Sequence, residues 1–241
     1  MQSPFLLENE SAYRTWRSRK LQDYPTDITE LIVEVGDPRK PTQAEYEAIL
    51  RVCRKTNMAI YAGRTGADPD KDIPRLLGQR LGLERLDCNI LADDDGLTSL
   101  KVEEGASRQG YIPYTNRPIK WHTDGYYNSP DRQIRGMLLH CVHSAAEGGG
   151  NALLDHEIAY LLMRDENPDY VRALMQPDAM TIPARVEEGG VARPDAVGPV
   201  FSLYPDMGDL HMRYTGRTRS IAWKQDAATL AAVAFLEKLL G

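Results

Sequence analysis

The sequence "PIKWHTDGYYN" at residues 118–128 places a histidine and an aspartate two positions apart in a run that is typical of a β-strand. Side chains at positions i and i+2 of a strand point to the same side, so His122 and Asp124 would point to one place. An imidazole and a carboxylate arranged in this way are suitable ligands for a divalent metal ion. The alternative is that His122 is a partly buried histidine with hydrogen-bond partners, and that Asp124 begins a turn with Gly125.

The part of the chain before this pair is predicted to be rich in helix. The runs "PTQAEYEAILRVCRKTN" and "DKDIPRLLGQRLGL" carry apolar residues at helical spacing, and the short apolar run "MAIYAG" between them is typical of a strand that ends at Gly63. We therefore expect a βαβ-like arrangement ahead of the His122 motif.

From residue 98 onward, short predicted strands are separated by turns, which indicates antiparallel β-structure. These strands are "TSLKVEE", "IKWHTD", "RGMLLHCVH", "NALLD", "AMTIPA", "GPVFSLY" and "LHMRYT", and "PDMGD" is the hairpin turn between the last two. Helices are predicted at "HEIAYLLMRD", "PDYVRALMQ" and "DAATLAAVAFLEKLL". The predicted fold class is α+β, mainly β: a double-stranded β-helix, or jelly roll, with flanking helices. We expect a single domain over residues 1–241, with a helix-rich part at 1–97 and the jelly-roll core at 98–241.

The charge balance of the 241 residues excludes one class of partner. The chain has 29 Lys and Arg against 35 Asp and Glu, a formal net charge of −6, whereas a nucleic-acid-binding surface needs a basic face. No stretch approaches the roughly 20 apolar residues that span a bilayer, and the first residues lack the pattern of a secretory signal, so we expect a cytoplasmic protein. Cys53, Cys88 and Cys141 are far apart and odd in number, and we interpret all three as buried thiols.

The runs "KWHTDGYYN", "GMLLHCVHSAAEGGGNALLD", "HEIAYLLM" and "GDLHMRYTGRTRSIAW" resemble the taurine dioxygenase-like (TauD/TfdA) family of Fe(II)- and 2-oxoglutarate-dependent oxygenases. The resemblance implies a dioxygenase that uses Fe(II), 2-oxoglutarate and molecular oxygen to hydroxylate a small organic substrate, with release of succinate and CO2. It also implies that His122 and Asp124 are two of three iron ligands. Asn151 occupies the place of a Thr that helps this family to hold the distal carboxylate of 2-oxoglutarate. The alternative for Asn151 is a turn residue in "GGGN".

Substrate contacts are expected around the same pair. Lys120 is on the side of His122 by strand alternation, and Asn116, Tyr126 and Arg213 are further candidates for lining the mouth of the jelly roll. A small anionic or polar substrate would suit these residues. The alternative for Lys120 is a solvated charge near the end of a strand. Arg217 and Arg219 are assigned no catalytic role.

No other histidine is convincing as the third ligand. His140 and His143 lie on opposite faces of a regular strand, so at most one of them points inward. His156 begins a predicted helix and is expected to be solvated, and His211 lies on a later strand.

The resemblance implies that the third ligand, a His, and the Arg that pairs with 2-oxoglutarate follow the helix predicted at 226–240. We therefore expect a chain that is truncated at its C-terminus or a degenerate member of the family, and we expect the 241 residues by themselves to be incompetent for turnover. That last helix is expected to leave Leu230, Val233, Leu236 and Leu240 exposed.

Two alternatives to a dioxygenase remain. One is a non-catalytic or metal-binding jelly-roll protein, and the other is a zinc-dependent hydrolase that uses His122, Asp124 and another histidine. The expected partners are a small-molecule substrate and molecular oxygen, with neither nucleic acid nor membrane, and homo-oligomerisation stays open.

Overall fold

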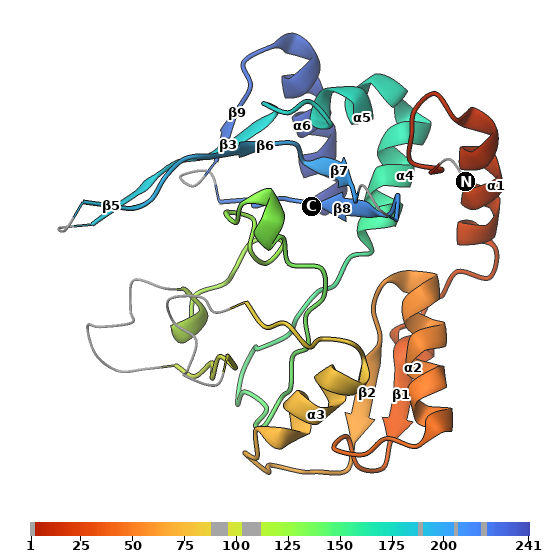
Figure 1. Cartoon of the computed structure of the whole chain (residues 1–241), viewed down its shortest axis with the longest axis vertical. Coiled ribbons are helices and arrows are strands. Elements are labelled where there is room, and N and C mark those ends of the chain that lie inside the picture. The colour runs from red at the N-terminus through yellow and green to blue at the C-terminus, as the bar shows by residue number, and fades with distance from the viewer. Residues whose placement is uncertain (1–2, 88–95, 103–111, 188–189, 205–206, 218–220) are drawn as a thin grey trace.

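The computed structural model describes residues 3–87, 96–102, 112–187, 190–204, 207–217 and 221–241. Helices and small sheets alternate along the chain (Figure 1). The α-helices are α1 (Glu10–Leu21), α2 (Gln43–Thr56), α3 (Asp72–Arg80), α4 (His156–Glu166), α5 (Pro168–Leu174) and α6 (Ala227–Leu240), and short 3-10 helices lie at Ile28–Leu31, Ile112–Tyr114 and Pro130–Arg132. The strands are β1 (Ile32–Val35), β2 (Ile60–Gly63), β3 (Met180–Ile182), β4 (Arg185–Glu187), β5 (Gly190–Arg193), β6 (Ala196–Gly198), β7 (Phe201–Leu203), β8 (Leu210–Met212) and β9 (Ala222–Trp223).

The predicted βαβ arrangement is confirmed by β1, α2 and β2. A capping box begins α2, in which Thr42 Oγ1 accepts from the Glu45 backbone N–H at 3.3 Å and Glu45 Oε2 accepts from the Thr42 backbone N–H at 2.6 Å. Asn57, the residue after the helix, has the left-handed φ of 57° that a C-terminal turn requires. β1 and β2 pair in parallel, and Ile49 of α2 and Val35 of β1 are buried in one small apolar cluster.

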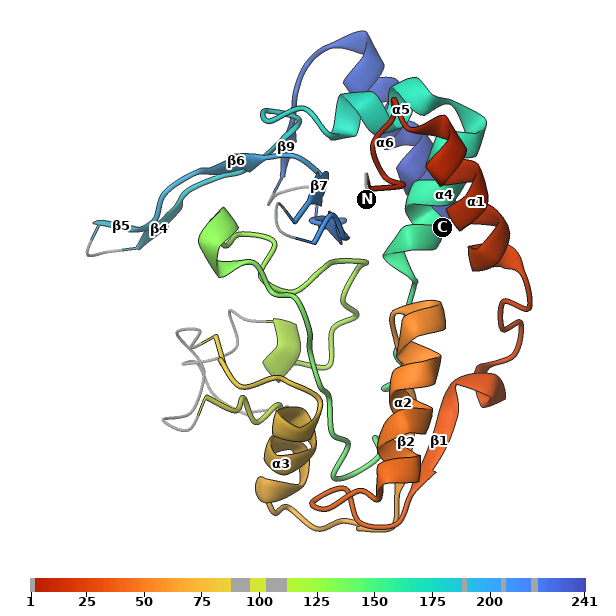
Figure 2. The ribbon, with the colours of Figure 1, turned by 45° about the vertical axis from the view of Figure 1, so that its right-hand side comes forward.

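A larger core lies between α1, α4, α5 and α6 and the strands that follow residue 180. Tyr160, Leu174, Met180, Phe201 and Leu236 are each fully buried there. The four helices stand together in Figure 2, with β3, β6 and β9 beside them. This core carries most of the buried apolar surface and so most of the hydrophobic stabilisation.

The prediction that the last helix leaves its apolar face exposed is wrong for two of the four leucine and valine positions. Val233 and Leu236 are 5% and 0% exposed, because α6 packs against α4 and α5. Leu230 is exposed, and Leu240 is partly buried against the same core.

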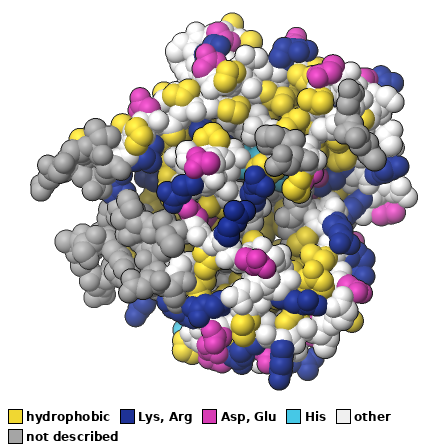
Figure 3. Space-filling model, in the orientation of Figure 1, with side chains coloured by type: hydrophobic (Ala, Val, Ile, Leu, Met, Phe, Trp, Pro, Cys, Tyr) yellow, Lys and Arg dark blue, Asp and Glu magenta, His cyan; other side chains and the backbone are white. Residues whose placement is uncertain are grey.

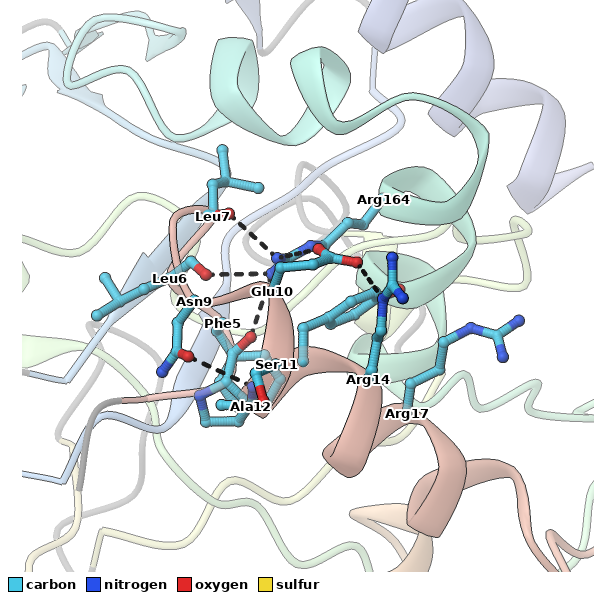
Figure 4. A network of polar contacts seen from close by, with 12 residues as sticks. Phe5, Leu6, Leu7, Asn9, Glu10, Ser11, Ala12, Arg14, Arg17 and Arg164 are labelled. Atoms are coloured by element: carbon cyan, nitrogen blue, oxygen red, sulfur yellow. Dashed lines mark hydrogen bonds and ion pairs between the residues drawn. The ribbon is translucent and has the colours of Figure 1, made fainter.

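Arg164 of α4 fixes the first residues of the chain to the core. Its guanidinium donates to the backbone oxygens of Pro4 at 3.1 Å and of Leu6 and Leu7 at 3.3 Å, and it lies 3.3 Å from a carboxylate oxygen of Glu10 (Figure 4). The residue is 3% exposed, so these contacts compensate for burying the charge. The segment before α1 is thereby held against α4.

The strands form four small sheets among the described residues. β1 and β2 are parallel, whereas every pair after residue 180 is antiparallel, with the orders β6-β3-β9, β4-β5 and β7-β8. The pairing of β7 with β8 confirms the predicted hairpin. β4 and β5 project from the body as an arm (Figures 1 and 2).

Several predicted strands are absent from the described residues. No strand forms at 98–102, 135–143 or 151–155, and the predicted strand at 119–124 is reduced to a single bridge at His122. A strand needs a partner for its backbone hydrogen bonds, and these segments have none among the described residues; the apolar Met137, Leu139 and Leu153 are more than half exposed. The structure thus has a mixed helix-and-sheet class, and the jelly roll stays a prediction.

The prediction that the cysteines are buried thiols is wrong for Cys141. Cys141 is exposed because it lies in the unpaired segment 135–143, while Cys53 is half-buried in α2. Cys88 lies outside the described residues.

Within the described residues, no helix has both the length and the apolar character that crossing a bilayer requires.

Candidate functional site

Backbone pairing between two distant segments positions His122. An antiparallel bridge joins His122 to Thr215, which follows β8. The Thr123 backbone N–H donates to the oxygen of Tyr214 at 3.0 Å, and the Gly216 N–H donates to the oxygen of Trp121 at 2.8 Å. Residues 121–123 therefore lie directly beside residues 214–216.

The two ring nitrogens of His122 have different partners. Nδ1 lies 2.8 Å from the backbone oxygen of Lys120, and because a carbonyl can only accept, Nδ1 carries the proton. Nε2 then faces Oδ1 of Asp124 at 3.5 Å. The side chains of His122 and Asp124 are 32% and 48% exposed, so solutes can reach both. The predicted closeness of the two side chains is confirmed, although Asp124 lies in a turn and the strand does not continue to it.

The charges around His122 act on its ring in opposite directions. The hydrogen bond with Asp124 raises the pKa of His122, while partial burial and the positive charge of nearby Arg217 oppose that rise. Without a metal ion, the pair is thus a carboxylate beside an imidazole that readily takes a proton.

A turn directly after Asp124 aims its carboxylate. Gly125 has a φ of +63°, and its oxygen accepts from the Asn128 backbone N–H at 2.8 Å. A Cβ on Gly125 would lie 2.5 Å from Cγ1 of Ile134, so glycine is required there for space as well as for conformation. The prediction that Asp124 begins a turn is therefore confirmed together with its closeness to His122.

The other residues predicted to contact substrate are spread around this pair. Lys120 and Asn116 are exposed, and Tyr126 is partly buried against the larger core with its ring 5.2 Å from that of Tyr127. Within the described residues, no hydrogen bond or ion pair joins Asn116 or Tyr126 to His122 or Asp124.

Asn151, predicted to contact 2-oxoglutarate, is exposed in the segment that leads to α4. Its amide nitrogen donates to the backbone oxygen of Gly149 at 3.3 Å, as a turn residue would. Gly149 itself has a φ of +71°, which the tight turn requires. The contact with 2-oxoglutarate stays a prediction.

Arg213 lies inside the protein. It is 7% exposed, and Nη2 donates to the backbone oxygens of Met180 at 2.8 Å, Ala196 at 3.3 Å and Gly198 at 3.4 Å. Burial lowers the pKa of Arg213 to about 10, and Nε has no hydrogen-bond partner among the described residues. A substrate would contact this guanidinium only after displacing its bonds to β3 and β6.

His211 lies on β8, and His156 lies beside this strand. Burial, and then the positive charges of His156 and Arg213, lower the pKa of His211 to about 4, and the ring lies 5.5 Å from that of Tyr204. Nε2 of His156 lies 3.0 Å from the backbone oxygen of Leu210. The prediction that His156 is solvated is therefore wrong, because α4 begins against β8.

His140 packs against β2 and has its hydrogen-bond partner there. Its Nδ1 lies 2.7 Å from the hydroxyl of Tyr61, their rings stack at 6.0 Å, and burial lowers the pKa of His140. His143 is exposed. Within the ranges that the structure describes, no group of three or more His, Cys, Asp or Glu could hold a metal ion. The third ligand is thus still a prediction.

A separate shallow hollow of about 990 Å³ lies between α1 and α2. It is lined by polar and basic residues that include Arg19, Arg51 and Arg54, and by Tyr46. Neither His122 nor Asp124 lines it, so this hollow is distinct from the candidate site.

Sequence reasoning missed one charged neighbour of the pair. Arg217 is exposed, follows the paired residues 214–216 and acts on the pKa of His122. Only the pairing of "KWHT" with "RYTG" reveals this neighbour. The paired residues are some ninety positions apart, so no local pattern in the sequence predicts it.

Lys and Arg side chains are also visible over the middle of the face in Figure 3, between the upper and lower parts of the molecule.

Comparison with known proteins gives the same family as the motifs. A protein called uridine-5'-phosphate dioxygenase from an Amycolatopsis species is 35% identical over 95 residues, which are 39% of this chain and 33% of that protein. One of the same name from a Streptomyces species is 31% identical over 126 residues, 51% of this chain and 42% of that protein. The chain thus spans about a third to two-fifths of the length of the curated relatives it matches.

No solved structure matches the chain. The family described as "Taurine catabolism dioxygenase TauD, TfdA family" matches residues 65–240, which is well over half of the sequence. The chain therefore belongs to the TauD, TfdA family.

Proposed function

We propose that this chain supplies the metal-binding pair of an Fe(II)- and 2-oxoglutarate-dependent dioxygenase that hydroxylates a small organic substrate. The observation that carries the proposal is the geometry of His122, whose Nδ1–H is held by the Lys120 oxygen while Nε2 faces Asp124 at 3.5 Å. Membership in the TauD, TfdA family supports it further.

The donor chemistry of the pair fits Fe(II). A metal-bound histidine commonly donates its other ring N–H to a backbone carbonyl or carboxylate, which fixes the tautomer and leaves the ligating nitrogen free. Nε2 of His122 and Oδ1 of Asp124 are 3.5 Å apart and both side chains are accessible, so these two atoms could bind the same metal ion. An imidazole and a carboxylate also form two-thirds of the two-histidine, one-carboxylate set of non-haem Fe(II) oxygenases.

When bound, Fe(II) with 2-oxoglutarate and oxygen would supply the oxidation, with succinate and CO2 as co-products. The protein's own residues would then hold and orient the reactants. Asn151 is proposed for the distal carboxylate of 2-oxoglutarate, because an amide N–H donates to a carboxylate. Lys120, Asn116 and Tyr126 are proposed for the substrate. Asp124 would remain ionised as a ligand and would have no role in proton transfer.

We also propose that these residues belong to a jelly roll in a cytoplasmic enzyme. The antiparallel pairing of all described strands after residue 180 supports the jelly roll. Free Cys53 and Cys141 are compatible with a reducing compartment.

The names of the relatives suggest a substrate class. Both act, by name, on uridine-5'-phosphate. We propose that the substrate of this chain is likewise a small phosphorylated molecule of the nucleoside monophosphate class. The formal charge of −6 would keep polymeric nucleic acid away from most of the surface.

A non-catalytic metal-binding protein is the second candidate, because no third ligand joins His122 and Asp124 among the described residues. Succinate release from 2-oxoglutarate under air, with Fe(II) or Zn(II) added, separates the two. In a protein extended to include the third ligand and the Arg that the resemblance implies, we expect Fe(II)-dependent succinate that is lost in His122→Ala and Asp124→Ala and kept in His143→Ala, a control at an exposed histidine. Metal binding without succinate from any of these proteins would contradict the dioxygenase, and hydrolytic activity with Zn(II) would indicate a hydrolase.

A further inference from the structure

Lys120 and Arg217 both lie beside the His122–Asp124 pair. The bridge between His122 and Thr215 and the hydrogen bond from Gly216 N–H to Trp121 O pair the two segments, and Lys120 and Arg217 are the next residue on each of them. The backbone oxygen of Lys120 accepts from Nδ1–H of His122 at 2.8 Å, which places Lys120 directly beside the ring.

The stem of Lys120 packs against the segment that carries Arg217. A Cβ built on Gly216 would lie 3.4 Å from Cβ of Lys120 and 3.8 Å from its Cδ. The aliphatic part of Lys120 therefore lies over Gly216, the residue directly before Arg217. Arg217 in turn is close enough to His122 for its charge to act on that ring.

Neither cation is used to stabilise the fold. Within the described residues, no carboxylate forms an ion pair with Lys120 or Arg217, and both side chains are exposed. Asp124, the nearby carboxylate, faces His122. Other cations of the chain have a carboxylate partner. Nζ of Lys224, for example, lies 2.9 Å from Oδ1 of Asp178. Two like charges that are close together repel each other, and an anion bound between them would be attracted to both.

We propose that Lys120 and Arg217 together bind the phosphate group of the substrate beside the metal ligands, an assignment that rests on the proposed function. The planar guanidinium of Arg217 can hold two phosphate oxygens at once, and the Lys120 ammonium adds a mobile point charge with three donors. The pair would thus select a phosphorylated substrate over its neutral alcohol. Placed next to His122, it would also fix the distance between the phosphate and the metal ligands.

The test is a binding measurement with the full 241-residue chain at fixed ionic strength. Isothermal titration with uridine-5'-phosphate, uridine, inorganic phosphate and 2-oxoglutarate would be carried out on the wild type, Lys120→Ala, Arg217→Ala and Arg217→Lys. Arg51→Ala is the matched control, because Arg51 is an exposed arginine on α2 outside this site. Thermal unfolding of each variant checks that its fold is unchanged.

The wild type is expected to bind the nucleotide more tightly than uridine. Losing one charged hydrogen-bonding partner should weaken nucleotide binding roughly tenfold to a hundredfold in Lys120→Ala and in Arg217→Ala. Uridine and 2-oxoglutarate affinities should not change, Arg217→Lys should retain part of the nucleotide affinity, and Arg51→Ala should match the wild type.

Three results would overturn the assignment. These are no nucleotide binding by the wild type, equal affinity for nucleotide and uridine, and variants that weaken 2-oxoglutarate and not the nucleotide. A different measurement tests the proposed function. It would be contradicted if His122→Ala and Asp124→Ala bound Fe(II) as tightly as the wild type. Nucleotide discrimination that persists without Fe(II) binding would still support the phosphate site.

Discussion

Replacing Lys20 with methionine removes the cation from a buried cluster that joins α1, α2 and α4. Lys20 is 6% exposed, and its Nζ lies 2.6 Å from Oδ2 of Asp155 and 2.5 Å from Oε2 of Glu157. Asp155 is 2% exposed, and it also accepts from the Tyr24 hydroxyl at 3.0 Å and from Asn57 Nδ2 at 2.9 Å. The ammonium is thus the positive charge that balances a buried carboxylate.

The cost of Lys20→Met follows from the charge that it leaves behind. Removing one partner of a buried ion pair typically destabilises a protein by about 3 to 5 kcal/mol, because the other charge stays buried without compensation. Asp155 keeps its neutral donors, including the Glu157 backbone N–H at 2.9 Å, which the carboxylate caps at the start of α4. We therefore expect a loss of about 3 kcal/mol in the free energy of unfolding, at the lower end of that range.

Urea denaturation followed by circular dichroism measures this loss as a shift in midpoint at constant slope. The double variant Lys20→Met/Asp155→Asn should recover part of the loss, because an amide can still cap α4 and no longer needs a cation. The matched control is Arg14→Met, which breaks an exposed ion pair with Glu10 and should cost little, because water and salt screen such a pair. A cost for Lys20→Met as small as that of Arg14→Met would refute the reasoning.

Three further predictions concern the site and its surroundings. Gly125→Ala should destabilise the protein by about 1 to 3 kcal/mol in urea denaturation, because the new Cβ would meet Ile134 at 2.5 Å, and a change below 0.5 kcal/mol would contradict the turn geometry. The pKa of His211 falls from 6.5 to about 4 on folding, so the unfolded chain binds the proton first and stability should fall as the pH drops from 6.5 towards 4. His211→Asn should remove up to about 3 kcal/mol of that decrease in the free energy of unfolding. A pH dependence of unfolding in urea that is the same in His211→Asn and the wild type would contradict this prediction. Asn151→Ala should weaken 2-oxoglutarate binding about tenfold in calorimetry, and an unchanged dissociation constant would leave Asn151 as a turn residue only.

Local sequence signals correctly predicted α2 to α6 and the βαβ-like arrangement, whereas α1 and strand β1 were not predicted. The spacing of Ile49 and the other apolar residues of α2, and the pair Thr42 and Glu45 at its start, act within a few residues of each other, so they can be recognised without knowing the fold. The closeness of His122 and Asp124 was predictable for the same reason, because it depends on an i, i+2 relation.

Features that depend on distant pairing could not be predicted. The run at 135–143 alternates as a strand does, yet whether it becomes one depends on a partner elsewhere, and the described residues offer none. The neighbourhood of Lys120 and Arg217 depends on the bridge between His122 and Thr215. Arg213 was expected to line the mouth of the jelly roll, and only its bonds to the carbonyls of β3 and β6 reveal its interior position.

Direct titration of the chain with Mn(II), a redox-stable substitute for Fe(II), tests the central claim that His122 and Asp124 form a metal-binding pair. Electron paramagnetic resonance of free Mn(II) gives the dissociation constant for the wild type, His122→Ala, Asp124→Ala and the control His143→Ala. We predict that the wild type and His143→Ala bind alike, and that each variant of the pair loses about tenfold or more in affinity, since each removes one ligand. Equal affinity of Asp124→Ala and the wild type, with both proteins folded, would contradict the account.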